Sequence, residues 1–429
     1  MMVLQKWNNP KIIDEKLKIY TVKTDAGAVF WQHLQYQGAN MRQHGKKLCR
    51  EEFGFSLIEL IIYMALLGIL MTMVFSSFIP VMRTSSRQWR IAETKIETGV
   101  GLDLLRSDLE HAGFGLPWQF PAGVTPSPYS EPAPLADVPN VPRAILSEDI
   151  SASSMNTSDY LAIKALNVVR GVSSQKWGWL GRDASHVASV QPMSADAFNG
   201  NDMLIVIRPE VSPGENRQLV LNGVNYLVKY PSVTPTAAEL LALSFFAPPE
   251  TPSDPNGERY LIYGLRDNNG VSSRPFNRTD YYINNANVPA QCAPGTGTLV
   301  KATVNQADNG FVILPIVDCV ADFQVVYYLD TDGDGGWETR VNASGLSLMT
   351  AQQIRSQVKS IRCYVLTHEG GVDRTYTHPN ANINVGEVAA DGVTLQAGRV
   401  FNLNATIGAT WTNYRWKVYS LAVTPRNLQ

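Results

Sequence analysis

The order of apolar and polar residues divides the chain into a long helical segment and a strand-rich region. The 23 residues from Leu60 to Met82 carry no formal charge, and a helix of about 20 apolar residues crosses a hydrocarbon core. Apolar residues then recur at helical spacing, at Trp89, Ala92, Ile96, Val100, Leu105, Leu109 and Ala112. Gly113, Gly115 and Pro117 supply a stop signal. The pattern predicts one helix with a membrane-spanning half, residues 55–82, and an amphipathic half, residues 83–115, whose apolar stripe packs on a domain.

The remainder of the chain reads as strands and loops. Residues 116–143 contain eight prolines without a period, which indicates a linker or surface loop. Short runs rich in Val, Ile, Tyr and Leu predict strands at 160–164, 203–208, 218–230, 259–263, 280–283, 323–329, 360–366 and 414–423. Residues 231–258 and 284–297 are expected to be surface loops. We therefore expect an α+β fold, with the long helix packed on a mainly antiparallel β ectodomain at 144–429.

Glu59 is the single charged residue between Gly54 and Arg83. A carboxylate at the end of an apolar span is costly to bury and requires a positive partner. Basic residues precede the span, among them Lys46, Lys47 and Arg50. This bias predicts one pass, with the amino terminus in the cytoplasm and everything after Arg83 outside. An ordinary secretory signal would show a shorter apolar core that ends at a small-residue cleavage site.

The hexapeptide Gly54-Phe55-Ser56-Leu57-Ile58-Glu59 resembles the class III signal of type IV prepilins. The resemblance implies that a prepilin peptidase cuts between Gly54 and Phe55 and methylates the new amino terminus. Residues 1–54 then form the leader. Such leaders are usually far shorter, and a start at Met41 would give a basic leader of 14 residues. The other interpretation is an uncleaved single-pass anchor in which the hexapeptide is accidental.

Composition narrows the classes of function. Charged residues make up 17% of the chain and the net charge is -2, which gives no electrostatic footprint for nucleic acid. The sequence holds no nucleophile elbow, no Walker loop, no His-Glu-x-x-His and no dinucleotide-binding glycine pattern. Strand ends and loops explain His368-Glu369 and the pair Asp183 and His186 better than acid–base catalysis does. We expect no catalytic residue and no enzymatic activity.

Two of the four cysteines are expected to pair. Cys49 lies in the leader, whereas Cys292 and Cys319 lie in a region that the topology places in an oxidising compartment. A bridge between them closes a loop of 28 residues, a constraint that stabilises by about 3 to 4 kcal/mol in the chain-entropy model. Cys363 lies in an apolar run and is expected to be a buried core residue. The spacings exclude the usual zinc patterns.

A run of alternating carboxylates suggests a cation site. Asp330, Asp332 and Asp334 alternate with small residues, and Gly335 holds the sixth place, as in the first half of an EF-hand loop. Ca²⁺ is the expected ion. Its expected ligands are Asp330, Asp332, Asp334, the Gly336 carbonyl and Glu338. The twelfth position is Val341 rather than a bidentate glutamate, so the match covers half of the loop. The other interpretation is an acidic hairpin turn built from residues that turns favour.

Three further segments extend the resemblance beyond the leader. Residues 104–115, 320–335 and 415–427 look like the corresponding parts of PilW-type minor pilins. The resemblance implies a protein that is held in the bacterial inner membrane by one helix, with a periplasmic C-terminal domain, and is then packed into a pilus. It implies Glu59 as the subunit-assembly residue. The implied partners are other major and minor pilins, the prepilin peptidase, the inner membrane and the pilus assembly platform.

Two alternatives remain open at the level of the sequence. A minor pseudopilin of a type II secretion system shares the same anchor. A membrane-tethered, calcium-binding adhesin or hydrolase ectodomain would never enter a filament.

Overall fold

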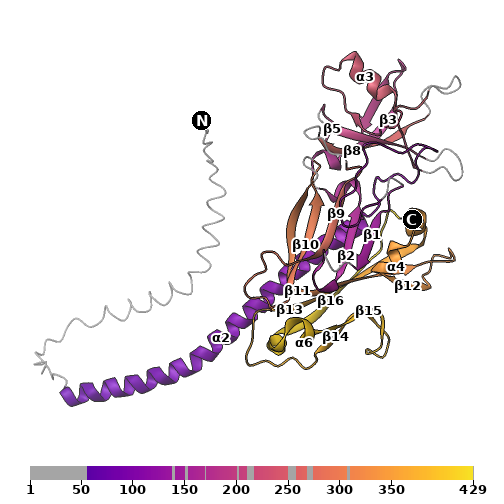
Figure 1. Ribbon diagram of the computed structural model, residues 1–429. Coiled ribbons are helices and arrows are strands. Elements are labelled where there is room, and N and C mark those ends of the chain that lie inside the picture. Colours follow the sequence, from indigo (N-terminus) through magenta and orange to yellow (C-terminus); the bar gives the residue numbers. More distant parts are fainter. Residues whose placement is uncertain are drawn as a thin grey trace, which may run out of the picture. The chain divides into compact units, whose positions relative to one another are not determined.

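The computed structural model describes residues 56–137, 141–149, 153–169, 171–200, 202–209, 217–249, 258–267, 274–306 and 310–428 (Figure 1). Contacts divide the chain into two units, Met1–Phe78 and Ile79–Gln429. The expected leader, residues 1–54, and Phe55 lie outside the described residues.

The first described element is the helix α2 (Leu57–Glu110). It continues through Pro80, although a proline inside a helix cannot donate an i→i−4 hydrogen bond. It ends before Gly113 and Gly115, whose φ angles of 84° and 70° suit glycine. A Cβ at Gly115 would lie 2.4 Å from Leu166 Cδ1, so close packing also requires a glycine there.

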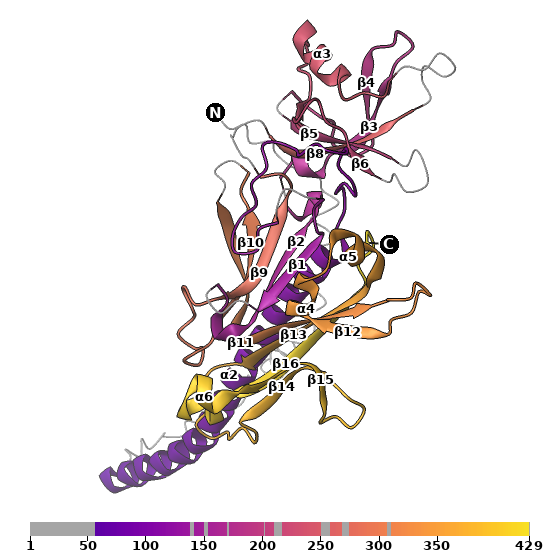
Figure 2. The same ribbon diagram turned by 45° about the vertical axis from the view of Figure 1, so that its right-hand side comes forward.

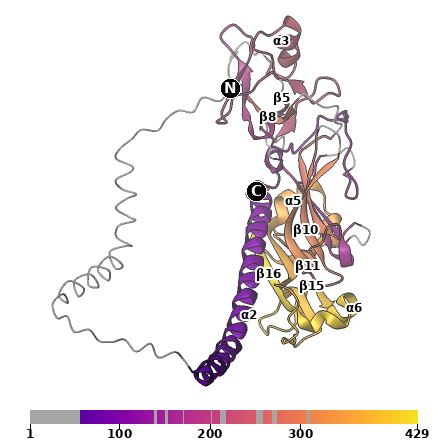
Figure 3. The same cartoon turned by 90° about the vertical axis from the view of Figure 1, so that its left-hand side faces the viewer.

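The main sheet is antiparallel, with the strand order β1-β2-β9-β10-β11-β13-β16, and β12 pairs with β11 (Figure 2). Its strands are β1 (Ile145–Asp149), β2 (Asp159–Lys164), β9 (Arg278–Asn284), β10 (Gly297–Val304), β11 (Phe311–Leu329), β12 (Thr339–Asn342), β13 (Val358–Glu369) and β16 (Arg415–Val423). The long strand β11 alternates between two cores. Phe323 and Val325 face the core that α2 covers, whereas Val326 and Tyr328 face a second core on the other side. Figure 3 shows α2 along one face of this sheet and α6 at the other.

Two smaller sheets complete the ectodomain. The six-stranded sheet has the order β4-β3-β8-β5-β6, with β7 paired to β5, and the two-stranded sheet is β14-β15. Their strands are β3 (Trp177–Arg182), β4 (Ala188–Pro192), β5 (Asp202–Arg208), β6 (Gln218–Leu219), β7 (Val228–Lys229), β8 (Tyr260–Asp267), β14 (Asn382–Val388) and β15 (Leu395–Asn402). Short helices are α3 (Ala237–Ser244), α4 (Ala343–Ser347), α5 (Ala351–Gln357) and α6 (Leu403–Ile407), and the 3₁₀ turns are η1 (Met155–Thr157), η2 (Leu166–Val168), η3 (Ser173–Gln175) and η4 (Ala409–Asn413).

The α+β prediction is confirmed, and most predicted strands are present. The run 218–230 contains only β6 and β7, two residues each, so the prediction of a continuous strand there is wrong. Residues 231–258 were expected to be a loop but contain α3. Thr236 and Glu239 form a capping box that starts this helix, a local signal that the Pro-rich surroundings obscure.

The proline-rich segment 116–143 is tied to the sheet by buried charges. Lys164 of β2 lies 2.8 Å from a Glu131 oxygen and 2.6 Å from an Asp137 oxygen, and Arg278 of β9 lies 3.4 Å from Glu131. All four side chains are less than a tenth exposed. Burying charges is costly unless they are paired, so this segment is specifically docked rather than loosely attached.

Candidate functional site

The described residues begin at Ser56, just before α2 and within the hexapeptide that resembles the prepilin signal. Glu59 lies in the first turn of the helix, where a carboxylate interacts favourably with the helix dipole. Its backbone N–H donates to the Ser56 carbonyl at 2.9 Å. No described residue forms an ion pair with the Glu59 carboxylate. Gly54 and Phe55, the expected processing residues, lie outside the described part of the chain.

The first half of α2 presents a mainly apolar surface to its surroundings, and Glu59 is its single charged residue. From Leu57 to Met82, every large apolar side chain is at least 46% exposed. The helix is long and apolar enough to cross a membrane by length and composition. Exposed apolar surface of this extent requires a lipid or protein environment.

The second half of α2 packs through a different face from the one the sequence suggested. The stripe residues Trp89, Ile96 and Val100 are 74%, 68% and 67% exposed. The buried positions are Thr94, Thr98, Gly101, Leu102, Leu105, Asp108 and Leu109. The expectation that the whole stripe packs on the domain is therefore correct only for its C-terminal end. Small and polar residues face the sheet in the middle of the helix, where the backbones approach closely.

Gly101 marks this close approach. A Cβ at this position would lie 2.1 Å from the Ile316 carbonyl oxygen of β11, so any larger residue would push the helix from the sheet. Two turns further along α2, Asp108 reaches into the sheet. Its Oδ2 lies 2.5 Å from Lys301 Nζ and accepts a hydrogen bond of 2.5 Å from the Tyr281 hydroxyl. All three side chains are buried.

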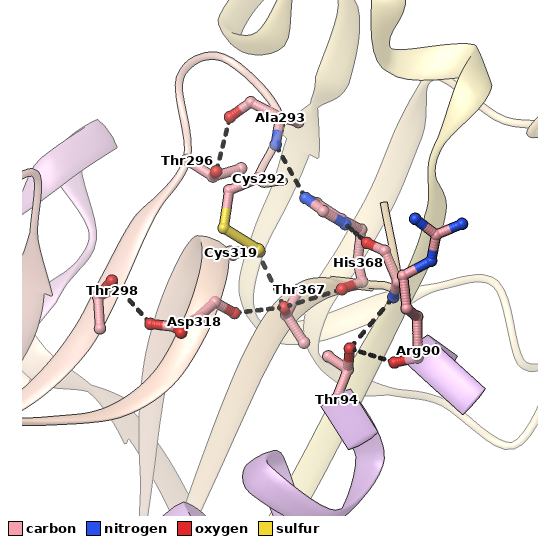
Figure 4. Close-up of a disulfide and its surroundings, with 11 residues drawn as sticks. Arg90, Thr94, Cys292, Ala293, Thr296, Thr298, Asp318, Cys319, Thr367 and His368 are labelled. Atoms are coloured by element: carbon pink, nitrogen blue, oxygen red, sulfur yellow. Dashed lines mark hydrogen bonds between the residues drawn. A yellow bond between two sulfur atoms is a disulfide. The ribbon is translucent and has the colours of Figure 1, made fainter. Parts of the chain in front are cut away.

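A second attachment of α2 runs through the disulfide region (Figure 4). Cys292 and Cys319 form a disulfide, with their Cα atoms 4.8 Å apart. Ala293, which follows Cys292 in the chain, donates its N–H to His368 Nε2 at 2.9 Å. The other ring nitrogen of His368, Nδ1, lies 2.9 Å from the Gly370 carbonyl. The Gly370 N–H donates to the Thr94 hydroxyl of α2 at 3.3 Å. The histidine thus connects the disulfide loop to the helix.

The hydrogen bonds define the state of His368. Because Nε2 accepts from a backbone N–H, Nδ1 carries the proton and donates to the Gly370 carbonyl, so the ring is neutral. Its side chain is fully buried, and burial lowers its pKa to about 4. Cys363 is also buried as expected, and burial raises the pKa of its thiol.

The acidic turn follows β11. Carboxylate oxygens of Asp330, Asp332, Asp334 and Glu338 all lie within 4.8 Å of one another. Asp330 is buried, and its two oxygens accept the backbone N–H groups of Gly333 at 2.6 Å and Gly335 at 3.0 Å. The turn therefore folds around Asp330.

This donor set fits a hard cation only in part. Four clustered carboxylates are the ligands that Ca²⁺ prefers. Lys359 Nζ lies 3.3 Å from Asp330 Oδ2, however, and this ammonium already neutralises one member of the set. The N–H of Gly336, whose carbonyl is an expected ligand, donates to Asp334 Oδ1 at 2.7 Å.

Comparisons with known families match two parts of the chain. Residues 280–427, about a third of the chain, match the family described as Type IV Pilus-assembly protein W. Residues 49–75 match the prokaryotic N-terminal methylation motif. The chain is type IV pilin-like. The matches confirm the resemblance to PilW-type minor pilins with a class III signal, and they enclose Glu59, the disulfide and the acidic turn. No curated protein and no solved structure matches the chain.

Sequence reasoning missed three groups of this pilin-like chain. The sequence places His368 at a strand end or loop, yet the residue is buried and connects the disulfide loop to the helix. Asp108 had no expected role, although a carboxylate beside Leu105 and Leu109 on a helical face is a signal of a buried partner. Gly101 inside a helix was a similar signal, because glycine is unfavourable there without a packing reason.

Proposed function

We propose that this protein is a minor pilin of a type IV pilus that contributes to the initiation of the filament or to its tip. The observation that carries the proposal is the combination of the two family matches with one helix whose first half is apolar and exposed on every side. A filament core built from packed helices would cover this surface.

The free face of the second half of α2 supports the same proposal. Trp89, Ile96 and Val100 lie on the side of the helix away from the sheet, and all three are mainly exposed. Lone exposed apolar residues are ordinary, but a stripe continuous with a membrane-spanning segment is not. Neighbouring pilin helices would bury the stripe, and packing rather than the hydrophobic effect would select them within the bilayer.

Glu59 would specify the register of this packing. We propose that the prepilin peptidase cuts after Gly54, and that the new ammonium at Phe55 of a neighbouring subunit pairs with the Glu59 carboxylate. A carboxylate in an apolar environment is costly without such a partner. Buried polar pairs often set register rather than stability. The orientation is amino terminus in the cytoplasm and ectodomain in the periplasm, as the basic residues before the span predict.

Intact-mass analysis and co-purification test this proposal. Protein recovered from cells with an active prepilin peptidase should begin at a methylated Phe55, and sheared pili should contain the protein together with major and minor pilins. An unprocessed amino terminus would favour the tethered ectodomain. A processed protein that is absent from pili but associated with a type II secretion system would favour the pseudopilin.

A calcium site in the acidic turn is a second proposal, supported by the four clustered carboxylates. Asp332, Asp334 and Glu338 are exposed and would provide most of the ligands, with Asp330 shaping the turn. The affinity would be weak, about 10⁻⁴ to 10⁻³ M, because the ligand set is incomplete. Asp330 is unsuitable for a test by substitution, since its loss would leave two turn N–H groups without acceptors.

A further inference from the structure

A cavity of about 1070 Å³ lies between the proline-rich segment and α5. Its lining includes Trp118, Arg143, Arg355 and Lys359, together with the hydroxyl residues Ser347 and Thr350. The cavity is large enough for a small-molecule ligand. Neither family match includes Trp118, and the proposed filament function gives the cavity no role.

The wall of the cavity has an excess of positive charge. Asp137 is the single carboxylate residue in the lining, and its oxygens are taken by Lys164 and Arg143. Lys359 lies 3.3 Å from Asp330. Arg355 has no such partner in the described part of the chain, and its Nη1 is buried without an acceptor.

A second unpaired guanidinium lies on the same indole. The Cζ atoms of Arg217 and Arg355 are each 5.3 Å from the centre of the Trp118 ring. The Nε of Arg217 is also buried without an acceptor among the described residues. Trp118 donates its backbone N–H to the Arg217 carbonyl at 2.8 Å, which fixes this arginine beside the ring.

This arrangement is electrostatically unfavourable as it stands. Burial, and then the charge of Arg217, lower the pKa of Arg355 to about 10. Burial also lowers the pKa of Arg217. Cation–π contact with Trp118 offsets only part of the cost of two like charges held together. An anion in the cavity, which Arg355 lines, would offset this positive charge.

We propose that this cavity binds a phosphate- or sulfate-type oxyanion, held by Arg355 with Arg217 behind it. A guanidinium presents a planar fork of donors that matches tetrahedral oxyanions, and its stacking on Trp118 leaves the fork pre-oriented. The Thr350 hydroxyl in the lining accepts the Gln353 N–H and provides a further donor. The same chemistry occurs on free inorganic oxyanions and on phospholipid headgroups.

The test monitors the thermal unfolding of the full-length protein in detergent by tryptophan fluorescence. Inorganic phosphate or sulfate should raise the melting temperature in a saturable way, whereas chloride at equal ionic strength should not. Arg355→Gln should weaken phosphate binding at least tenfold. Arg340→Gln is the matched control, because Arg340 also stacks on an aromatic ring, that of Trp337 at 4.9 Å, and does not line the cavity. It should leave phosphate binding unchanged.

Nanodiscs distinguish the two sources of the oxyanion. If the protein in phosphatidylglycerol nanodiscs shows the Arg355-dependent shift without added phosphate, and the protein in phosphatidylcholine nanodiscs does not, a headgroup is the ligand. If both need added phosphate, the ligand is a free solute. Equal shifts with phosphate and chloride would overturn the proposal. So would phosphate binding that is unchanged in Arg355→Gln. Should Arg355→Gln fail to fold, the comparison of phosphate with chloride on the unmodified protein decides alone.

Discussion

Replacing Asp108 by alanine should loosen the attachment of α2 to the main sheet. Asp108 is the acidic partner of Lys301, at 2.5 Å, and it also accepts the Tyr281 hydroxyl. The Lys301 side chain is 6% exposed, so the truncation would leave its ammonium in the interior without a counter-charge. Removing one partner of a buried ion pair typically costs about 3 to 5 kcal/mol.

The expected change in melting temperature follows from the size of the folded unit. The unit that contains the ectodomain has about 350 residues, and the entropy of unfolding is about 2.1 cal/mol/K per residue. A loss of about 4 kcal/mol should therefore lower the melting temperature by roughly 5 °C. The fluorescence of the seven tryptophans of this unit reports the transition in the full-length protein in detergent.

A double-mutant cycle with Lys301 provides the control. Lys301→Met alone should also destabilise, because it leaves the Asp108 carboxylate buried without its cation. Asp108→Ala combined with Lys301→Met removes both charges and should cost clearly less than the sum of the two single variants. If the double variant is as unstable as the sum of the single variants, the ion pair does not hold the helix and the reasoning is wrong.

Three further predictions concern separate parts of the molecule. Glu59→Leu should leave membrane insertion and processing intact but lower incorporation into pili at least tenfold. Glu93→Leu, on the same helix, should not lower incorporation. Equal incorporation of the two variants would show that Glu59 is incidental. Calcium at ~1 mM should raise the free energy of unfolding of the full-length protein by RT ln(1 + [L]/Kd), about 0.4 to 1.4 kcal/mol for the proposed Kd. Asp332→Asn with Asp334→Asn should remove the effect, and equal melting with calcium and chelator would favour a plain turn. The His368 pKa is lowered from 6.5 to about 4, so the unfolded chain takes up a proton at a higher pH than the folded protein does. The contribution of the neutral ring to the free energy of unfolding should thus be fully present above pH ~6.5 and fall by roughly 3 kcal/mol as the pH drops toward 4. His368→Gln should flatten this pH dependence. An unchanged slope in that variant would contradict the role of the ring.

Local features of the sequence were enough to predict several parts of this protein. The uncharged run from Leu60 to Met82 predicts a spanning helix because apolar length is a property of consecutive residues. Gly54 and Glu59 predict the signal through their spacing, and the family match at 49–75 agrees with it. The acidic turn after β11 is also local, since alternating aspartates and glycines bend the backbone wherever they occur.

Long-range contacts decided the rest. Periodicity correctly predicted a helix over 83–110, but only the fold shows that Thr94 and Gly101 face the sheet while Ile96 faces away. The reason is the close approach of β11 at Gly101, which no local pattern encodes.

The buried polar groups show the same division between sequence and structure. His368 hydrogen-bonds to Ala293, 75 positions earlier in the chain, and Arg217 and Arg355 meet on Trp118, far from both in sequence. The sequence by itself determined the elements whose physics is set by neighbouring residues: the apolar span, the signal hexapeptide and the acidic turn. The tertiary structure decided which polar side chains are buried and what they contact, because the free energy of burying a charge or a donor depends on partners that only folding brings within hydrogen-bond distance.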